Sequence, residues 1–105
     1  MVVRVKEQSL LAGIAAKWLG ASKVAMVIGN TIYLHNASRA EFIKNLRWLR
    51  HEVAHVKQFA RHGTIRFLFL YFLESIRKGY FNNKFEIEAR SKEVDASILD
   101  DVTVQ

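Results

Sequence analysis

The chain has 105 residues, of which half are apolar, and a formal net charge of +6. This length suits one domain with one hydrophobic core, and the composition excludes an intrinsically disordered chain. There is no cysteine, which excludes disulfides, thiolate metal sites and cysteine nucleophiles. Any metal ion must therefore be bound by histidine, aspartate or glutamate.

The basic residues are scattered among acidic residues along segments with helical spacing. This distribution favours a solvated surface over a nucleic-acid footprint. The apolar runs 10–16 and 67–73 are too short to span a bilayer, and the N-terminus lacks a clear signal-peptide cleavage pattern. We therefore expect a soluble, cytoplasmic protein with no transmembrane segment and no nucleic-acid partner.

The first elements in chain order are a helix and a hairpin. Apolar residues recur at helical spacing over 10–19. Two short runs rich in β-branched residues follow, over 23–28 and 31–35, and Gly29-Asn30 separates them. Because this dipeptide favours a tight turn, the two runs predict a β-hairpin.

The next segment has a clear helix start. Ser38 and Glu41 have the spacing of a capping box, in which each side chain bonds the free backbone N–H of the other residue. Apolar residues then keep a helical period as far as Gly63. The pattern predicts one helix of about six turns.

Two further helices are expected before the tail. The segment 64–78 is apolar nearly all round, which predicts a helix at the centre of the core. A fourth helix is expected over 84–97, whereas the tail 98–105 has no helix signal. We therefore predict a mainly helical α+β fold in one domain, 1–105, with about four helices and a short β-hairpin.

The long predicted helix contains an HExxH motif, formed by His51, Glu52 and His55. Two histidines at i and i+4 lie one turn apart on the same face, so both imidazoles can bind one zinc ion at about 2.1 Å. Glu52 lies about 100° around the helix, where it can accept a proton from an attacking water and pass it to the leaving amine. The alternative is a pair of surface histidines beside nearby acids.

A catalytic zinc site needs a third protein ligand. Arg61 occupies the position where metzincins have a third histidine. His62 lies roughly 10 Å along the helix from His55, too far to share the ion, and interaction with the helix dipole is the better interpretation. His35 ends a predicted strand, so a surface position is favoured over one in the cleft. A carboxylate from another helix is therefore expected as the third ligand.

Glu86 and Glu88 are the candidates for this carboxylate. Residues two apart on a helix point about 200° apart, so only one of them can face the metal. Glu86 is favoured because Arg90, one turn further on, can bind its second oxygen. The alternative for both is an ordinary charged helix face.

The segment LRHEVAHVKQ, residues 49–58, followed by FEIEA, residues 85–89, resembles the gluzincin metallopeptidases. It is more closely similar to the catalytic core of HtpX-type membrane metallopeptidases, and in size to the soluble minigluzincins. The resemblance implies a minimal zincin-like fold, with zinc bound by His51, His55 and Glu86. It also implies that Glu52 is the general base and that an extended polypeptide adds as a strand along the hairpin. Arg90 is a departure, since many relatives have an acid four residues after the ligand glutamate.

Two tyrosines and the tail lead to further hypotheses. Tyr71 and Tyr80 are candidates to stabilise an oxyanion, although ordinary core or surface roles are favoured for both. Minigluzincins resemble zymogens whose C-terminal segments block the cleft. Here 97–105 could form an inhibitory tail in which Asp100 or Asp101 reaches the metal, and 102–104 could pair as a strand. The alternative is a frayed terminus.

The main hypothesis is a zinc-dependent endopeptidase that acts on extended polypeptide. One alternative is a basic helical module that binds nucleic acid or protein and contains an incidental HExxH. Another is a zincin that binds zinc without turnover.

Overall fold

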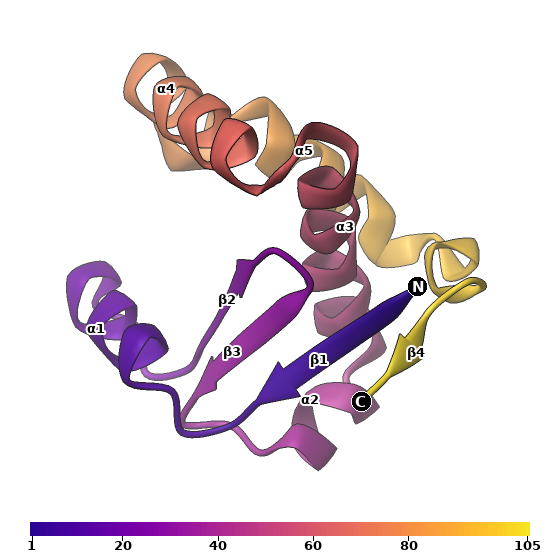
Figure 1. The fold of residues 1–105 in the computed structure, drawn as a ribbon. Coiled ribbons are helices and arrows are strands. Elements are labelled where there is room, and N and C mark those ends of the chain that lie inside the picture. The colour runs from indigo at the N-terminus through magenta and orange to yellow at the C-terminus, as the bar shows by residue number, and fades with distance from the viewer.

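The fold combines five α-helices with one four-stranded mixed sheet, in a computed structural model that describes residues 1–105 (Figure 1). The predicted class, a mainly helical α+β fold, is confirmed. In chain order the elements are β1 (Val2–Lys6), α1 (Leu10–Leu19), β2 (Val24–Ile28), β3 (Thr31–His35), α2 (Arg39–Lys44), α3 (Leu46–His62), α4 (Thr64–Asn82), α5 (Lys84–Ser91), two 3₁₀-helices η1 (Lys92–Val94) and η2 (Ala96–Leu99), and β4 (Thr103–Val104).

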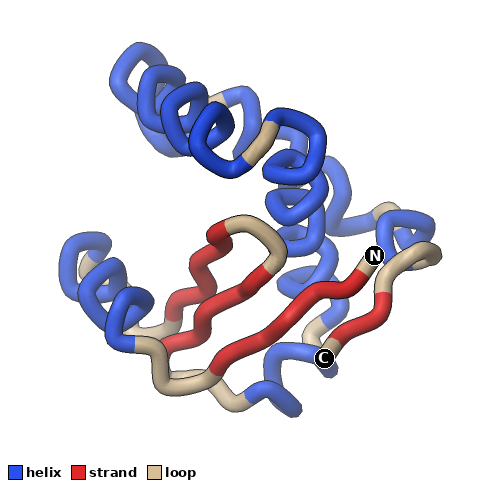
Figure 2. The backbone as a smooth tube through the Cα atoms, viewed as in Figure 1, coloured by secondary structure: helices blue, strands red, loops and turns tan.

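The strands lie side by side in the order β2-β3-β1-β4 (Figure 2). The predicted hairpin is confirmed: β2 and β3 are antiparallel, with Ile28 opposite Thr31. Gly29 has φ 63°, a left-handed conformation that tight hairpin turns require. β1 and β4 add in parallel. The strand β1 was not predicted, although Val3 and Val5 show the period-2 burial of a strand.

Helix α3 covers one face of the sheet, and α1 covers part of the other. The main core lies between the sheet and α2–α3 and contains Val3, Val5, Ile32, Leu34, Phe42, Leu49, Val53 and Val56. On the opposite face, Ala12 and Ala16 of α1 pack on Val24. β2 therefore lies between two helices, and its outer edge pairs with no other strand.

The single long helix predicted after Ser38 is wrong, because Asn45 divides it. Glu41 N–H donates to Ser38 Oγ at 3.0 Å, so one half of the predicted capping box is present, whereas the Glu41 carboxylate pairs with Lys23. However, α2 ends at Lys44, and Asn45 has non-helical φ −84° and ψ 89°. The Asn45 side chain accepts a hydrogen bond from Trp48 N–H at 3.2 Å and begins α3. A short amide side chain that bonds the backbone favours such a cap over a helix interior.

The prediction of a central core position for α4 is also wrong. Phe67 is its only buried residue, and most of its other large apolar side chains are exposed. The reason is that α4 packs mainly against α3 and α5, which leaves its outer side exposed. The predicted break after residue 78 is present, because Gly79 has non-helical φ 78° and ψ 167°, and a last helical turn follows this kink.

The predicted fourth helix is shorter than expected. α5 ends at Ser91 and two 3₁₀-helices follow, because the Asp95 carboxylate accepts a hydrogen bond from Ser97 N–H and begins a new turn. The tail then pairs as β4 beside β1, at the sheet edge opposite β2. None of the helices has both the length and the apolar content needed to cross a bilayer.

Candidate metal centre

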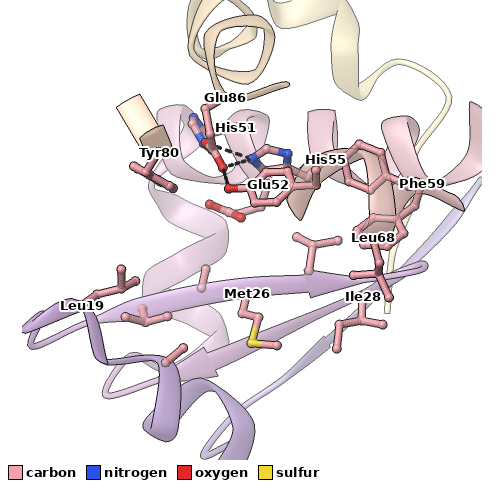
Figure 3. A pocket seen from close by; sticks show the side chains of 16 residues that line it. Leu19, Met26, Ile28, His51, Glu52, His55, Phe59, Leu68, Tyr80 and Glu86 are labelled. Carbon is pink, nitrogen blue, oxygen red and sulfur yellow. Dashed lines mark hydrogen bonds and ion pairs between the residues drawn. The ribbon is translucent and has the colours of Figure 1, made fainter. Parts of the chain in front are cut away.

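Three side chains from two helices converge at one point. His51 and His55 project from the same face of α3, with ring centroids 5.1 Å apart, and Glu86 comes from the first turn of α5. One donor atom from each residue lies within 4.8 Å of the others. Figure 3 shows the Glu86 carboxylate pointing at the two imidazoles. We call these three residues the His-His-Glu cluster.

Asn83 fixes the start of α5 and thereby the position of Glu86. It is fully buried, and its Oδ1 accepts a hydrogen bond from Phe85 N–H at 2.8 Å. Its Nδ2 donates to Tyr71 O at 3.1 Å and to Ser75 Oγ at 2.9 Å, which ties the cap to α4. A capped helix start anchored to a neighbouring helix places the third residue of α5 against α3.

The distances from Glu86 to the two histidines are close to those between ligands of a tetrahedral metal site. Glu86 Oε1 lies 3.1 Å from His51 Nε2, and both Glu86 oxygens lie 3.2 Å from His55 Nε2. Two ligand atoms at about 2.1 Å from a tetrahedral zinc ion are separated by about 3.4 Å. Only small side-chain movements would therefore be needed to bind zinc.

Gln58 fixes the tautomer of His55. Gln58 Nε2 donates to Phe85 O at 3.0 Å and to Glu88 Oε1 at 2.7 Å. The amide oxygen must therefore face His55 Nδ1, which lies 2.8 Å away. An amide oxygen only accepts hydrogen bonds, so Nδ1 carries the proton and Nε2 of the neutral ring presents a lone pair to the cluster.

Glu93 has the same effect on His51. Its Oε2 lies 2.8 Å from His51 Nδ1, and a carboxylate only accepts. Arg47 donates to Glu93 Oε1 and Arg50 donates to the Glu93 backbone oxygen, both at 3.1 Å, so this acceptor is itself held in place. Carboxylate–histidine pairs of this kind orient metal-binding imidazoles.

When both histidines are neutral, the atoms that meet in the cluster are two imidazole nitrogens with lone pairs and a carboxylate. Such atoms can bind a proton or a metal cation. Burial lowers the pKa of His51, but the contacts with Glu86, Glu52 and Glu93 outweigh this effect and raise it to about 9. Burial also lowers the pKa of His55, but the contacts with Glu86 and the charge of Glu52 outweigh this effect and raise this pKa overall. Burial raises the pKa of Glu86, but the two histidines outweigh it and hold this pKa far below its usual value. The donor set fits a divalent cation of the zinc type.

Glu52 lies beside the cluster and makes no direct contact with its donor atoms. It is buried on α3, and Figure 3 shows its carboxylate pointing into the cavity below the histidines. Burial raises the pKa of Glu52 to about 7, and the nearby histidines only partly oppose this rise. A carboxylate with a pKa near neutrality is suited to accept and return a proton.

A mostly apolar cavity of about 290 Å³ opens in front of the cluster. One wall is the whole of β2, and the opposite wall carries Glu52 and the His-His-Glu cluster. Val27 of β2 packs against the apolar clusters on the α3 side of the sheet, whereas Met26 packs against the α1 side. Figure 3 accordingly shows the Met26 side chain on the side of β2 away from the histidines. The free edge of the sheet therefore runs along the candidate metal site.

The two candidate tyrosines have different positions. Tyr71 donates a hydrogen bond to Glu86 Oε2, and burial together with this carboxylate raises the pKa of Tyr71 far above its ordinary value. Tyr80 lines the cavity and is 57% exposed. Burial of its hydroxyl and the Glu86 charge raise the pKa of Tyr80 to about 12. Tyr80 is thus the tyrosine that can donate to a ligand in the cavity.

Several predicted contacts are corrected. Arg90 does not bind the second oxygen of Glu86: it donates to Phe81 O and lies 4.2 Å above the Phe81 ring, while Tyr71 takes the predicted role. Glu88 faces Gln58 and Arg61 rather than the cluster, which agrees with the choice of Glu86.

The two remaining histidines lie outside the cluster. The His62 ring stacks on Phe67, with ring centroids 6.0 Å apart. His35 lies beside Gly13 of α1 and does not line the cavity. The interpretation of both residues as non-ligands agrees with this arrangement.

The tail does not reach the cluster. Asp101 pairs with Lys57 Nζ at 2.7 Å, Asp100 is exposed, and β4 lies at the sheet edge away from β2. No residue of 97–105 lines the cavity. This arrangement contradicts the predicted blockage of the site by Asp100 or Asp101, because pairing with β1 directs the tail to the other side of the sheet.

Sequence reasoning missed Glu93 and Gln58 as partners of the two histidines. Both had a usable signal: Gln58 lies at i+3 from His55, and Glu93 lies at i+7 from Glu86, positions that share a helix face. Tyr71 had no such signal as a partner of Glu86, since it comes from a separate helix.

We expect Glu93→Ala to lower zinc affinity about 10–100-fold, because His51 loses the acceptor that orients its ring. Competition with a chromophoric chelator measures this affinity. Asp100→Ala is the control, since Asp100 is exposed, and it should bind zinc like the wild type. Equal affinities for the two variants would contradict the role assigned to Glu93.

We also expect the stabilisation by zinc to increase with pH. Protonation of His51 stabilises the zinc-free fold fully below its ordinary pKa of 6.5, and this contribution is lost as pH rises toward about 9. Zinc requires neutral histidines, so protons compete less at higher pH. The rise in melting temperature at a buffered free zinc concentration should therefore be larger at about pH 8.5 than at about pH 6.5. A pH-independent rise would contradict this coupling.

Comparisons with known proteins do not assign the chain to a family. No family model matches it, and no curated protein or solved structure matches it either. A functional conclusion therefore depends on the cluster, the cavity and the strand edge.

Proposed function

We propose that this protein is a zinc-dependent metallopeptidase of the gluzincin type that cleaves extended polypeptide. The observation that carries the proposal is the His-His-Glu cluster, in which Glu93 and Gln58 turn both histidine Nε2 atoms toward Glu86. The HExxH motif and its resemblance to the minigluzincins support the same proposal.

His51, His55 and Glu86 would bind the metal. Two imidazole nitrogens and one carboxylate oxygen form a donor set that suits zinc, and three protein ligands leave one position for water or substrate. When bound, zinc supplies Lewis-acid polarisation of a carbonyl and activation of water.

Glu52 would act as the general base. Its carboxylate points into the cavity beside the cluster, and its pKa of about 7 allows a substantial ionised fraction at neutral pH. It would accept a proton from the attacking water and then donate that proton to the leaving amine. Tyr80 is positioned at the cavity to donate a hydrogen bond to the developing oxyanion.

The outer edge of β2 would bind the substrate backbone. It pairs with no strand of this chain, and it forms the cavity wall opposite Glu52. An extended peptide that adds to this edge would place a backbone carbonyl between the strand and the cluster. The apolar lining would bind apolar side chains of such a peptide.

The test is zinc-dependent hydrolysis of an unfolded polypeptide, such as reduced and carboxymethylated casein. We expect one zinc per chain in the purified protein, loss of cleavage with a chelator, and recovery when zinc is restored. Zinc binding without cleavage would instead favour a zincin that lacks turnover. Absence of zinc binding would favour a binding module in which the HExxH is incidental.

A further inference from the structure

Four large apolar side chains form an exposed stripe along α4. Ile65, Phe69, Phe72 and Ile76 have the spacing i, i+4, i+7, i+11 of one helix face, and each is 65–80% exposed. The buried Phe67 lies on the opposite face. Isolated exposed apolar residues are ordinary, but a contiguous stripe of this size marks a contact surface. We call it the α4 stripe.

A second exposed stripe runs along α1. Leu11, Ile14 and Trp18 share one face at i, i+3, i+7, and Trp18 is 87% exposed. The two helices also line the same cavity, α1 through Leu19 and α4 through Leu68. The helices α1 and α4 therefore border the two sides of one cleft, as their positions in Figure 1 indicate, and each also presents an exposed apolar stripe.

The charges on these two helices are almost entirely positive. Arg66, Arg77 and Lys78 of α4 and Lys17 of α1 form no ion pair. The only acid on either helix is Glu74. By helical spacing Glu74 lies on the side of α4 away from the α4 stripe, and its carboxylate accepts a hydrogen bond from Lys84 N–H.

Two kinds of partner could cover apolar stripes, a second copy of this chain or a lipid surface. A second copy would bring the unpaired cations of two chains together, and each chain already has a net charge of +6. Like charges across an interface are unfavourable. An anionic bilayer instead accepts both features, since apolar and aromatic side chains enter the headgroup region while Lys and Arg contact acidic lipids.

We propose that the α4 stripe and the α1 stripe dock this protein on an anionic lipid bilayer, with the cavity between them close to the lipid surface. The side chains insert from one side only, because no helix has the length and apolar content to span the bilayer. Docking of this kind does not depend on the proposed peptidase activity, so the two can be tested separately.

The experiment is co-sedimentation of the full chain with vesicles of phosphatidylcholine containing about 30% phosphatidylserine, compared with pure phosphatidylcholine. Binding is expected only to the anionic vesicles and should weaken with salt. Trp18 emission should shift to shorter wavelength on binding. Trp18→Phe should remove that shift, since Trp48 already packs on Phe42.

Two double variants, compared with a matched control, test the docking surface. Phe69→Ser with Phe72→Ser should weaken vesicle binding more than about tenfold, because two exposed aromatic anchors are lost. The matched control is Leu46→Ser with Val94→Ser, two exposed apolar residues outside α1 and α4, and it should bind like the wild type. Arg66→Gln with Arg77→Gln should weaken binding to the anionic vesicles about fivefold for each charge that is removed.

Three results would overturn the proposal. The first is no binding of the wild type to anionic vesicles. The second is unchanged vesicle binding of the Phe69→Ser, Phe72→Ser variant, provided that its circular dichroism matches that of the wild type. If this variant does not fold, Ile65→Ser with Ile76→Ser replaces it. The third is a stable dimer in analytical ultracentrifugation that the stripe substitutions dissociate, without vesicle binding, which would assign both stripes to self-association.

Discussion

Glu52→Gln is expected to abolish peptide hydrolysis while zinc remains bound. The side chain lies beside the His-His-Glu cluster but contributes no donor atom to it, so an amide of the same size should leave the metal ligands in place. The amide cannot accept the proton of the attacking water. Removal of a general base typically costs 10²–10⁴-fold in rate, and we expect a loss of about 10³-fold or more in kcat.

Zinc content and hydrolysis have to be measured on the same preparation. Glu41→Gln is the matched control, because Glu41 is an exposed glutamate on α2 that pairs with Lys23. It should retain both zinc and activity. Residual activity of Glu52→Gln close to that of the wild type would exclude Glu52 as the base. Loss of zinc together with activity would show that Glu52 supports the metal site rather than the proton transfer.

Local sequence patterns predicted the parts of this fold that depend on short-range physics. The hairpin follows from β-branched runs around Gly29-Asn30, and the face shared by His51 and His55 follows from the helical period. The break at Asn45 was not predicted, because the continuous apolar period around it favoured one long helix. Here a local side chain–backbone hydrogen bond outweighed periodicity.

The errors concern which surfaces the fold covers. The apolar sequence of α4 predicted a buried helix, yet burial depends on how many layers pack around it, and α4 packs mainly against α3 and α5. The tail was expected to pair as a strand, and it does, but the short sequence 102–104 could not indicate which sheet edge it would join. Long-range pairing of β4 with β1 decided that question.

The candidate site was predictable in its ligands and less so in their supports. The 200° separation of Glu86 and Glu88 predicted that only one of them faces the cluster, which agrees with the structure. The choice of Glu86 depended on Arg90 as its partner. Arg90 failed as its partner because its guanidinium stacks on Phe81 instead. Tyr71 fills that role from another helix, and contacts between helices cannot be read from spacing along one of them.

The largest effect on metal binding is expected from Glu86→Ala. This substitution removes the only carboxylate that contacts both histidines and leaves two imidazoles whose lone pairs no longer converge on an anionic ligand. A two-histidine site binds zinc far more weakly than a site with three protein ligands. We expect zinc affinity to fall by about 10²-fold or more, measured by competition with a chromophoric chelator at a pH where both histidines are neutral.

Glu88→Ala is the matched control, because it is the same substitution two residues further along α5. Glu88 contacts Gln58 and Arg61, and Gln58 keeps its bond to Phe85 O when Glu88 is removed, so His55 should keep its tautomer. Zinc affinity should therefore stay within about threefold of the wild type. If the two substitutions weakened zinc equally, or only Glu88→Ala did so, the carboxylate in the site would be misassigned, and the geometry of α5 on which the proposed peptidase mechanism depends would be wrong.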